Sequence, residues 1–177
     1  MKTAFIGHRQ IFSKDICERL KTAVHNEINN GCMTFTMGTH GQFDRCALFV
    51  CKELRKTYKD LTIEVVITSL NEIVRNNEYE MTPYSDVKTV MYDIEDAHFK
   101  QQITLSNRQM IDDCDALICY VNTLEYRSGA KTALRYAEKR GLKIINLYRK
   151  EDKPFYGMTY EQAHAYWKTL TENLNNK

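Results

Sequence analysis

Short apolar runs rich in β-branched residues alternate along this chain with longer segments whose apolar residues recur at helical spacing. The short runs predict strands, and the longer segments predict helices. Strands are expected at 3–6, 32–35, 61–67, 87–91, 116–121 and 143–147, and helices at 13–28, 43–58, 71–79, 96–113, 128–140 and 159–174. Strands joined by such helices are typical of βαβ units. We therefore expect an α/β fold: a single Rossmann-like domain with a mainly parallel sheet flanked by helices.

Individual residues within the expected helices make the prediction more specific. Ser13 is a suitable N-cap for the helix at 13–28. Phe49 is expected to face inward from the helix at 43–58. Thr159 and Gln162 resemble a capping box that opens a C-terminal helix. A chain of 177 residues suits one domain, here with a core at 2–147 and a helical extension at 159–174.

Composition excludes several classes of protein. Lysine and arginine exceed aspartate and glutamate by only 25 to 23, and no basic run is longer than two residues, which argues against nucleic acid as a partner. The apolar run at 116–121 is far shorter than the roughly 20 residues of a membrane span. The first ten residues lack the apolar stretch of a secretory signal. We expect a cytoplasmic protein with no membrane association.

Six cysteines raise the question of disulfides or a metal site. Cys46 and Cys51, like Cys114 and Cys119, are spaced five residues apart, which does not match the spacing of zinc ligands. Cys32 and Cys119 lie in apolar, strand-like runs where cysteine packs as a small hydrophobic residue. We expect reduced, mostly buried thiols, with no metal and no cofactor.

The loops after the first two strands carry the residue types that bind anions. Glycine lets a ligand approach the backbone, arginine offers a planar fork, and N–H groups at a helix start favour phosphate. The candidate ligand-binding residues in these two loops are Gly7, His8, Arg9, Gly38, Thr39, His40, Gly41 and Asp44. The pattern does not match the G-x-G-x-x-G motif of dinucleotide-binding folds.

Two later segments lead to the same edge of the expected sheet. Arg108 is expected to direct its guanidinium into the cleft, and small residues with nearby cations open the helix at 128–140. A P-loop is excluded because Glu125 and Ala130 stand where that motif requires glycine. The candidate residues in these segments are Arg108, Arg127, Ser128, Gly129 and Thr132. Because parallel strands place their carboxyl ends at one edge, the four segments predict one phosphate-binding cleft.

The order of these motifs resembles the YpsA-like branch of the SLOG superfamily. The resemblance spans about residues 2–147 and is carried by GHR, GTHGQFD, NRQMIDDCDALICYV and SGAKTALRYAEKRGLKIINL. It implies a Rossmann-like parallel sheet that binds nucleotides or nucleotide-derived ligands, and relatives often form homodimers. In this chain Thr39, His40 and Gln42 replace small residues of the family's second loop.

The same superfamily includes the Lonely Guy phosphoribohydrolases, whose PGGxGTxxE motif carries a catalytic glutamate. Aligning that motif on Ser128 and Gly129 places Arg135 at the glutamate position, and arginine cannot stabilise an oxocarbenium ion. The sequence therefore favours a cytosolic nucleotide-binding sensor or carrier over an enzyme. One alternative is a nucleotide N-glycosidase with Asp44 or Glu138 as its acid/base, and another is an interaction protein with a vestigial cleft. The ligand's base and phosphate count stay open.

Overall fold

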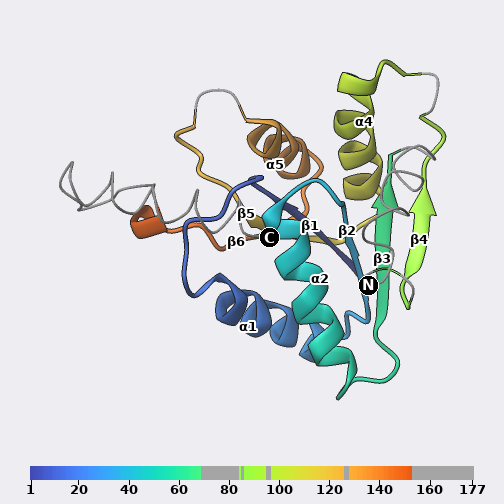
Figure 1. The fold of residues 1–177 in the computed structure, drawn as a ribbon, viewed down its shortest axis with the longest axis vertical. Helices are drawn as coiled ribbons and strands as arrows, with labels where there is room; N and C mark the ends of the chain where they lie inside the picture. The colour runs from blue at the N-terminus through green and yellow to red at the C-terminus, as the bar shows by residue number, and fades with distance from the viewer. Residues whose placement is uncertain (69–83, 85, 95–96, 126–127, 153–177) are drawn as a thin grey trace, which may run out of the picture.

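The computed structural model describes residues 1–68, 84, 86–94, 97–125 and 128–152 (Figure 1). Its elements, in chain order, are β1 (Lys2–Gly7), α1 (Ile16–Asn29), β2 (Thr34–Met37), α2 (Gln42–Arg55), β3 (Thr62–Ile67), β4 (Lys88–Met91), α4 (Phe99–Asp112), β5 (Ala116–Tyr120), α5 (Gly129–Lys139), β6 (Lys143–Asn146) and the 3-10 turn η1 (Lys150–Asp152). The predicted helices at 71–79 and 159–174 lie outside the described residues, as does Arg127. Each described strand and helix overlaps one that the sequence predicts.

The described strands form one six-stranded sheet in the order β4-β3-β2-β1-β5-β6, and every neighbouring pair is parallel. Among the described connections, α1 joins β1 to β2, α2 joins β2 to β3, α4 joins β4 to β5 and α5 joins β5 to β6, as is usual for crossovers between parallel strands. The expected α/β fold with a flanked parallel sheet is confirmed. The order reverses between β1 and β5, and open α/β sheets bind ligands at such a switch point, outside the carboxyl ends of the strands.

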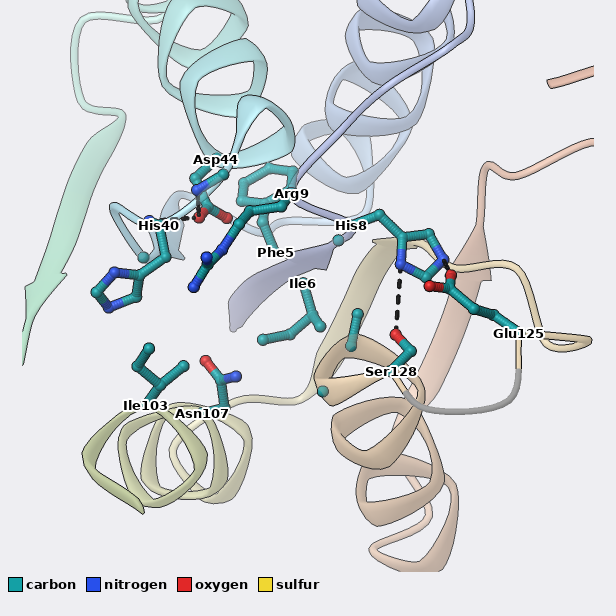
Figure 2. Close-up of a pocket in the computed structure, with 15 residues that line it drawn as sticks. Phe5, Ile6, His8, Arg9, His40, Asp44, Ile103, Asn107, Glu125 and Ser128 are labelled. Atoms are coloured by element: carbon teal, nitrogen blue, oxygen red, sulfur yellow. Dashed lines mark hydrogen bonds and ion pairs between the residues drawn. The ribbon is translucent and has the colours of Figure 1, made fainter. Parts of the chain in front are cut away.

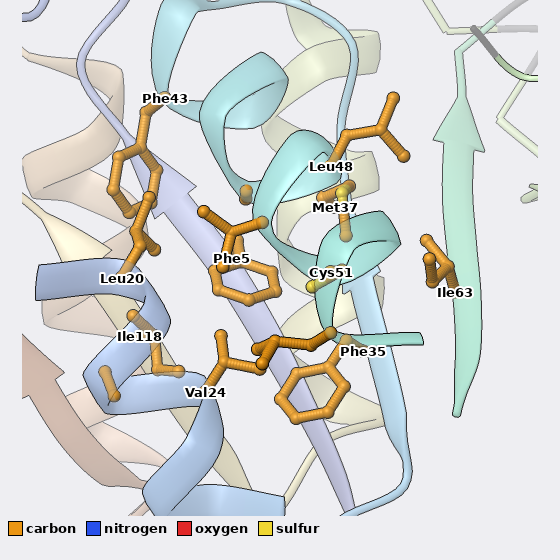
Figure 3. Packing of buried hydrophobic residues seen from close by; sticks show 14 of the residues in the cluster. Phe5, Leu20, Val24, Phe35, Met37, Phe43, Leu48, Cys51, Ile63 and Ile118 are labelled. Atoms are coloured by element: carbon orange, nitrogen blue, oxygen red, sulfur yellow. The ribbon is translucent and has the colours of Figure 1, made fainter. Parts of the chain in front are cut away.

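Side chains alternate between the two faces of the sheet, so each central strand contributes to two layers of core. Phe5 of β1 and Ile118 of β5 pack with α1 and α2 on one face (Figure 3). Ala4 and Leu117, one residue earlier in each strand, pack with α4 and α5 on the other. Both faces of β5 are buried along its whole length, as expected for a central strand of a parallel sheet.

Two predictions about the helices are wrong in detail. The helix predicted from Ser13 begins at Ile16, and Asp15, not Ser13, precedes it. The Ser13 hydroxyl instead donates to Asp15, whose carboxylate pairs with Arg19 one turn into the helix. Phe49 was expected inside but is 59% exposed, because Leu48 and Val50 occupy the inward face of α2.

The six cysteines form no disulfide bond, and four of them are buried, which confirms the prediction that the thiols are mostly buried. In the part of the chain that the structure describes, no helix has the length and apolar character needed to cross a membrane.

Candidate functional site

A cavity of about 340 Å³ opens at the carboxyl edge of the sheet, where β1, β2 and the start of α5 meet (Figure 2). Ligand pockets typically span roughly 300–1,000 Å³. Nine of the thirteen ligand-binding candidates line the cavity: Gly7, His8, Arg9, Gly38, His40, Gly41, Asp44, Ser128 and Gly129. Loops that are far apart in the sequence therefore meet at one place, where the sheet order reverses.

Three described candidates do not line this cavity. Arg108 is exposed and holds its guanidinium 5.5 Å from the centre of the Tyr136 ring. Thr132 is exposed and donates its hydroxyl to the carbonyl of Ser128, and Thr39 is not part of the lining. The two catalytic candidates also differ, since Asp44 lines the cavity whereas Glu138 is exposed and does not.

Helix α4 reaches the cavity through Ile103 and Asn107 instead of Arg108. These two residues are four positions apart and so lie on the same side of the helix. The sequence does not single out Asn107, because a neutral amide binds an anion less strongly than the neighbouring Arg108 guanidinium. Ile103 lies on the apolar side of the predicted helix. Asn107 follows it by one helical turn and so lies on the same side, and this spacing is the signal that identifies Asn107.

Two cavity glycines are required by close packing. A Cβ atom on Gly7 would lie 2.3 Å from Cγ of Phe43, and one on Gly41 would lie 3.1 Å from Cα of Arg9. The loop after β1 is thus packed directly against the start of α2. Gln42 strengthens the contact, because its amide donates to the Arg9 carbonyl and its side-chain oxygen accepts from the Ile11 amide.

The start of α2 is occupied by the protein's own carboxylate. Oδ2 of Asp44 accepts hydrogen bonds from the amides of His40, at 2.9 Å, and Gly41, at 3.0 Å. Burial raises the pKa of Asp44 to about 6, although these two amides oppose the shift. A phosphate at this point would meet a carboxylate that already uses the available donors. The loop at 38–44 therefore suits a hydroxyl group better than an anion.

The start of α5 is arranged differently. Ser128 is its N-cap, and the Ser128 hydroxyl accepts from the Lys131 amide at 3.2 Å. Helix geometry leaves the N–H groups of Gly129 and Ala130 without an intrahelical partner, and both residues line the cavity. A Cβ atom on Gly129 would meet no heavy atom within 4 Å. This end of the cavity has both the donors and the space for an anion.

His8 connects β1, β5 and α5 through its two ring nitrogens. Nε2 accepts from the Asn122 amide at 2.7 Å, and Nδ1 lies 3.3 Å from the Ser128 hydroxyl. A nitrogen that accepts an N–H bond carries no proton, so the proton of the neutral ring is assigned to Nδ1. Burial lowers the pKa of His8, while the charge of Glu125 opposes the shift, so the ring is neutral near pH 7.

This tautomer determines what Ser128 can do. Nδ1–H of His8 then donates to the Ser128 oxygen, which also accepts from Lys131. With both lone pairs engaged, the hydroxyl proton of Ser128 is left for a ligand. Oε2 of Glu125 lies 3.2 Å from Nε2 of His8 but receives no proton from the neutral ring.

The charged groups around the cavity limit the ligand's charge. Among the described lining residues, Arg9 is the single arginine or lysine, whereas Asp44 and Glu125 are carboxylates. In the sequence, Glu125 stands out only because it replaces a glycine of the P-loop pattern. One cationic side chain and one free helix N-terminus fit a single phosphate better than a polyphosphate.

Metal binding has no visible basis in the described part of the chain, which contains no group of three or more histidine, cysteine, aspartate or glutamate residues that could hold an ion.

Comparison with models of protein families finds no match. A search of curated proteins finds none either. The fold and the cavity define the chain as a Rossmann-like α/β protein with a cavity of mixed polar and apolar lining at the sheet's switch point.

Proposed function

We propose that this chain is a cytosolic binding protein, a sensor or carrier, for a nucleotide or a nucleotide-derived ligand. The observation that carries the proposal is the start of α5, where the free N–H groups of Gly129 and Ala130, the Ser128 hydroxyl proton and Arg9 border one cavity. These groups would hold one phosphate. Asp44 lines another part of the same cavity, in the first turn of α2. It would accept a hydrogen bond from a ribose hydroxyl.

The family resemblance supports the same proposal. The segments that resemble the YpsA-like branch of the SLOG superfamily include the loops after β1 and β2 and the start of α5, and all three line the cavity. We propose membership of that branch on the order of these motifs together with the Rossmann-like sheet.

The proposal is tested by a charge change that keeps the helix cap. Aspartate and asparagine are both as good N-caps as serine, so Ser128→Asp and Ser128→Asn should fold equally well. A carboxylate at this position would repel a phosphate, so Ser128→Asp should weaken the binding of ribose 5-phosphate at least tenfold more than Ser128→Asn. Isothermal titration calorimetry measures both affinities. Equal affinities in the two variants would place the phosphate elsewhere.

Arg9 provides a second test of the same assignment. Its side chain is exposed, so Arg9→Gln should leave the fold intact and lower the affinity for ribose 5-phosphate. The loss should be larger at low salt than at high salt because ions screen exposed charges. Arg135→Gln is the matched control, since Arg135 is exposed on α5 and does not line the cavity. The same affinity for the Arg9 and Arg135 variants would remove Arg9 from the site.

The state of Asp44 favours one second candidate, a nucleotide N-glycosidase. A carboxyl with a pKa of about 6 in a cavity is suited to general acid/base chemistry. Incubation with a nucleotide pool, followed by mass spectrometry, separates the two functions. A sensor or carrier retains an intact ligand, whereas an N-glycosidase accumulates free base, and Asp44→Asn should then abolish the release.

A further inference from the structure

A second cavity, of about 500 Å³, adjoins the first. His8, Arg9 and Glu125 border both cavities. The second one continues from these residues toward Phe12, Tyr120 and Tyr148. A ligand that extends past His8 could therefore occupy both.

Aromatic rings form much of the second cavity's wall. Tyr148 packs edge-on against Tyr120, with 5.3 Å between ring centres, and against His8, with 6.5 Å. Phe43 stacks on Tyr120 with ring centres 5.9 Å apart and ring planes 21° apart, which holds Tyr120 in place. Tyr148 is only partly buried. A flat heteroaromatic ring is the kind of group that such walls bind well.

The hydroxyl of Tyr120 is a buried polar group with no hydrogen-bond partner among the described residues. Tyr120 is 1% exposed, and within the described part of the chain its oxygen makes no hydrogen bond. Burial raises the pKa of Tyr120, and the nearby Phe12 amide only partly opposes the shift, so the hydroxyl keeps its proton at neutral pH. A buried hydroxyl without a partner costs free energy unless something else bonds to it.

One of the two carboxylates in this cavity's wall is already engaged. Asp152 accepts two hydrogen bonds from Arg19, at 2.9 and 2.8 Å, and a third from the Arg149 amide. Two further polar groups in this wall are the Tyr120 hydroxyl and the carboxylate of Glu125, whose side chain is 48% exposed. One can donate to a ring nitrogen or carbonyl, and the other can accept from an amino group.

We propose that the second cavity holds the nucleobase of the ligand whose phosphate lies at the start of α5, with Tyr148 packing on the base and Tyr120 donating a hydrogen bond to it. This inference rests on the proposed function and extends it by naming where the base lies. It makes the ligand a nucleoside monophosphate or a molecule that contains one, not a sugar phosphate alone.

The test compares ribose 5-phosphate with AMP, GMP, CMP and UMP by calorimetry. At least one nucleotide should bind tenfold or more tightly than ribose 5-phosphate, since stacking of a base on aromatic side chains strengthens binding by this order. Tyr148→Ala should remove most of that gain and leave the affinity for ribose 5-phosphate unchanged. Tyr148→Phe should keep the gain because it retains the ring.

Tyr120→Phe separates binding from a merely structural role. It removes only the unpartnered hydroxyl, so the ligand-free protein should melt at the same or a higher temperature. The affinity for the preferred nucleotide should nevertheless fall several-fold, and that for ribose 5-phosphate should not.

The outcomes distinguish this inference from the proposed function. If ribose 5-phosphate binds but no nucleotide binds more tightly, the base site is wrong and the phosphate site stands. The base site is also wrong if the gain survives both Tyr148→Ala and Tyr120→Phe. If none of the five compounds binds, the proposed function fails, and the base site fails with it.

Discussion

At the scale of single residues, two side chains decide what the cavity can bind. The Asp44 carboxylate accepts hydrogen bonds from the backbone amides at the start of α2. Nδ1–H of His8 donates to the Ser128 oxygen and so leaves the Ser128 hydroxyl proton for a ligand. The sequence predicts two similar phosphate loops, one at 38–44 and one at 127–132. The structure distinguishes them, because an acidic residue in the first turn of a helix can fold back onto the loop's own amides.

Asp44 should make the protein's stability depend on pH with an unusual sign. Its pKa is raised from 3.8 to about 6 by burial, so its contribution to stability is fully present below pH 3.8 and is lost as the pH rises through 6. Relative to wild type, Asp44→Asn should therefore gain up to about 3 kcal/mol of unfolding free energy between roughly pH 4 and pH 7. Urea denaturation at both pH values measures the difference.

Asp86 supplies a control of opposite sign. Hydrogen bonding from Lys52 lowers its pKa, so its contribution is present above its ordinary pKa and is lost as the pH falls through the lowered one. Asp86→Asn should thus be less stable than wild type at pH 7 and approach it in acid. A pH-independent difference for Asp44→Asn would contradict the raised pKa.

Residue-scale predictions from sequence depend on which way a helix is turned. Neighbouring residues in an α-helix point about 100° apart, so Asn107 can face the cavity while Arg108 lies over Tyr136. Which of the two faces inward depends on how α4 packs on the sheet. Hydrophobic periodicity alone does not determine that orientation. Residues in loops directly after strands can be placed at the cavity without it, because the strand ends already lie at that edge of the sheet.

At the scale of elements, hydrophobic period is enough to predict every strand and α-helix that the structure describes, with ends shifted by up to three residues, whereas the 3-10 turn η1 is not predicted. The ends differ because capping depends on local side-chain contacts. Serine is a common N-cap residue, but the N-cap of α1 is Asp15, whose carboxylate pairs with Arg19 in the first turns of the helix. Phe49 faces outward because the buried side of α2 includes fewer positions than the helix has apolar residues.

Two glycines at the ends of different elements should respond oppositely to the same substitution. Gly7→Ala places a methyl group 2.3 Å from the Phe43 ring, and should destabilise the protein by at least about 2 kcal/mol. Gly129→Ala meets no neighbour, and should leave stability unchanged or raise it by up to about 1 kcal/mol because alanine favours helix. Thermal unfolding of both variants measures this. Comparable losses in the two would contradict the packing described for Gly7.

At the scale of the whole molecule, the strand order places the loops after β1 and β2 and the start of α5 around one cavity (Figure 2). Alternating strands and helices predict this convergence, since the carboxyl ends of parallel strands share one edge. The second cavity could not be predicted in the same way. It depends on Tyr148, which follows β6, lying against His8, which follows β1.

A buried ion pair fixes that arrangement by joining α1 to η1. Arg19 and Asp152 are 9% and 6% exposed and share two hydrogen bonds. Asp152→Ala should cost roughly 2–4 kcal/mol, somewhat below the cost of fully isolating a buried charge because Asp15 still pairs with Arg19. Arg149→Ala, which removes an exposed pair with Asp15, is the control and should cost at most about 1 kcal/mol. Equal unfolding free energies for the two variants would show that Arg19 is not held by Asp152.

The measurement that tests the central claim most directly is a titration of ribose 5-phosphate followed by the amide resonances of the ¹⁵N-labelled protein. The account predicts that the amides of Gly129 and Ala130 shift most and saturate with ligand, because their N–H groups bind the phosphate. The amides of Gly31 and Gly141, in turns that do not line the cavity, should stay in place and serve as internal controls. Saturating shifts that spare Gly129 and Ala130, or no shifts at all, would contradict a phosphate site at the start of α5.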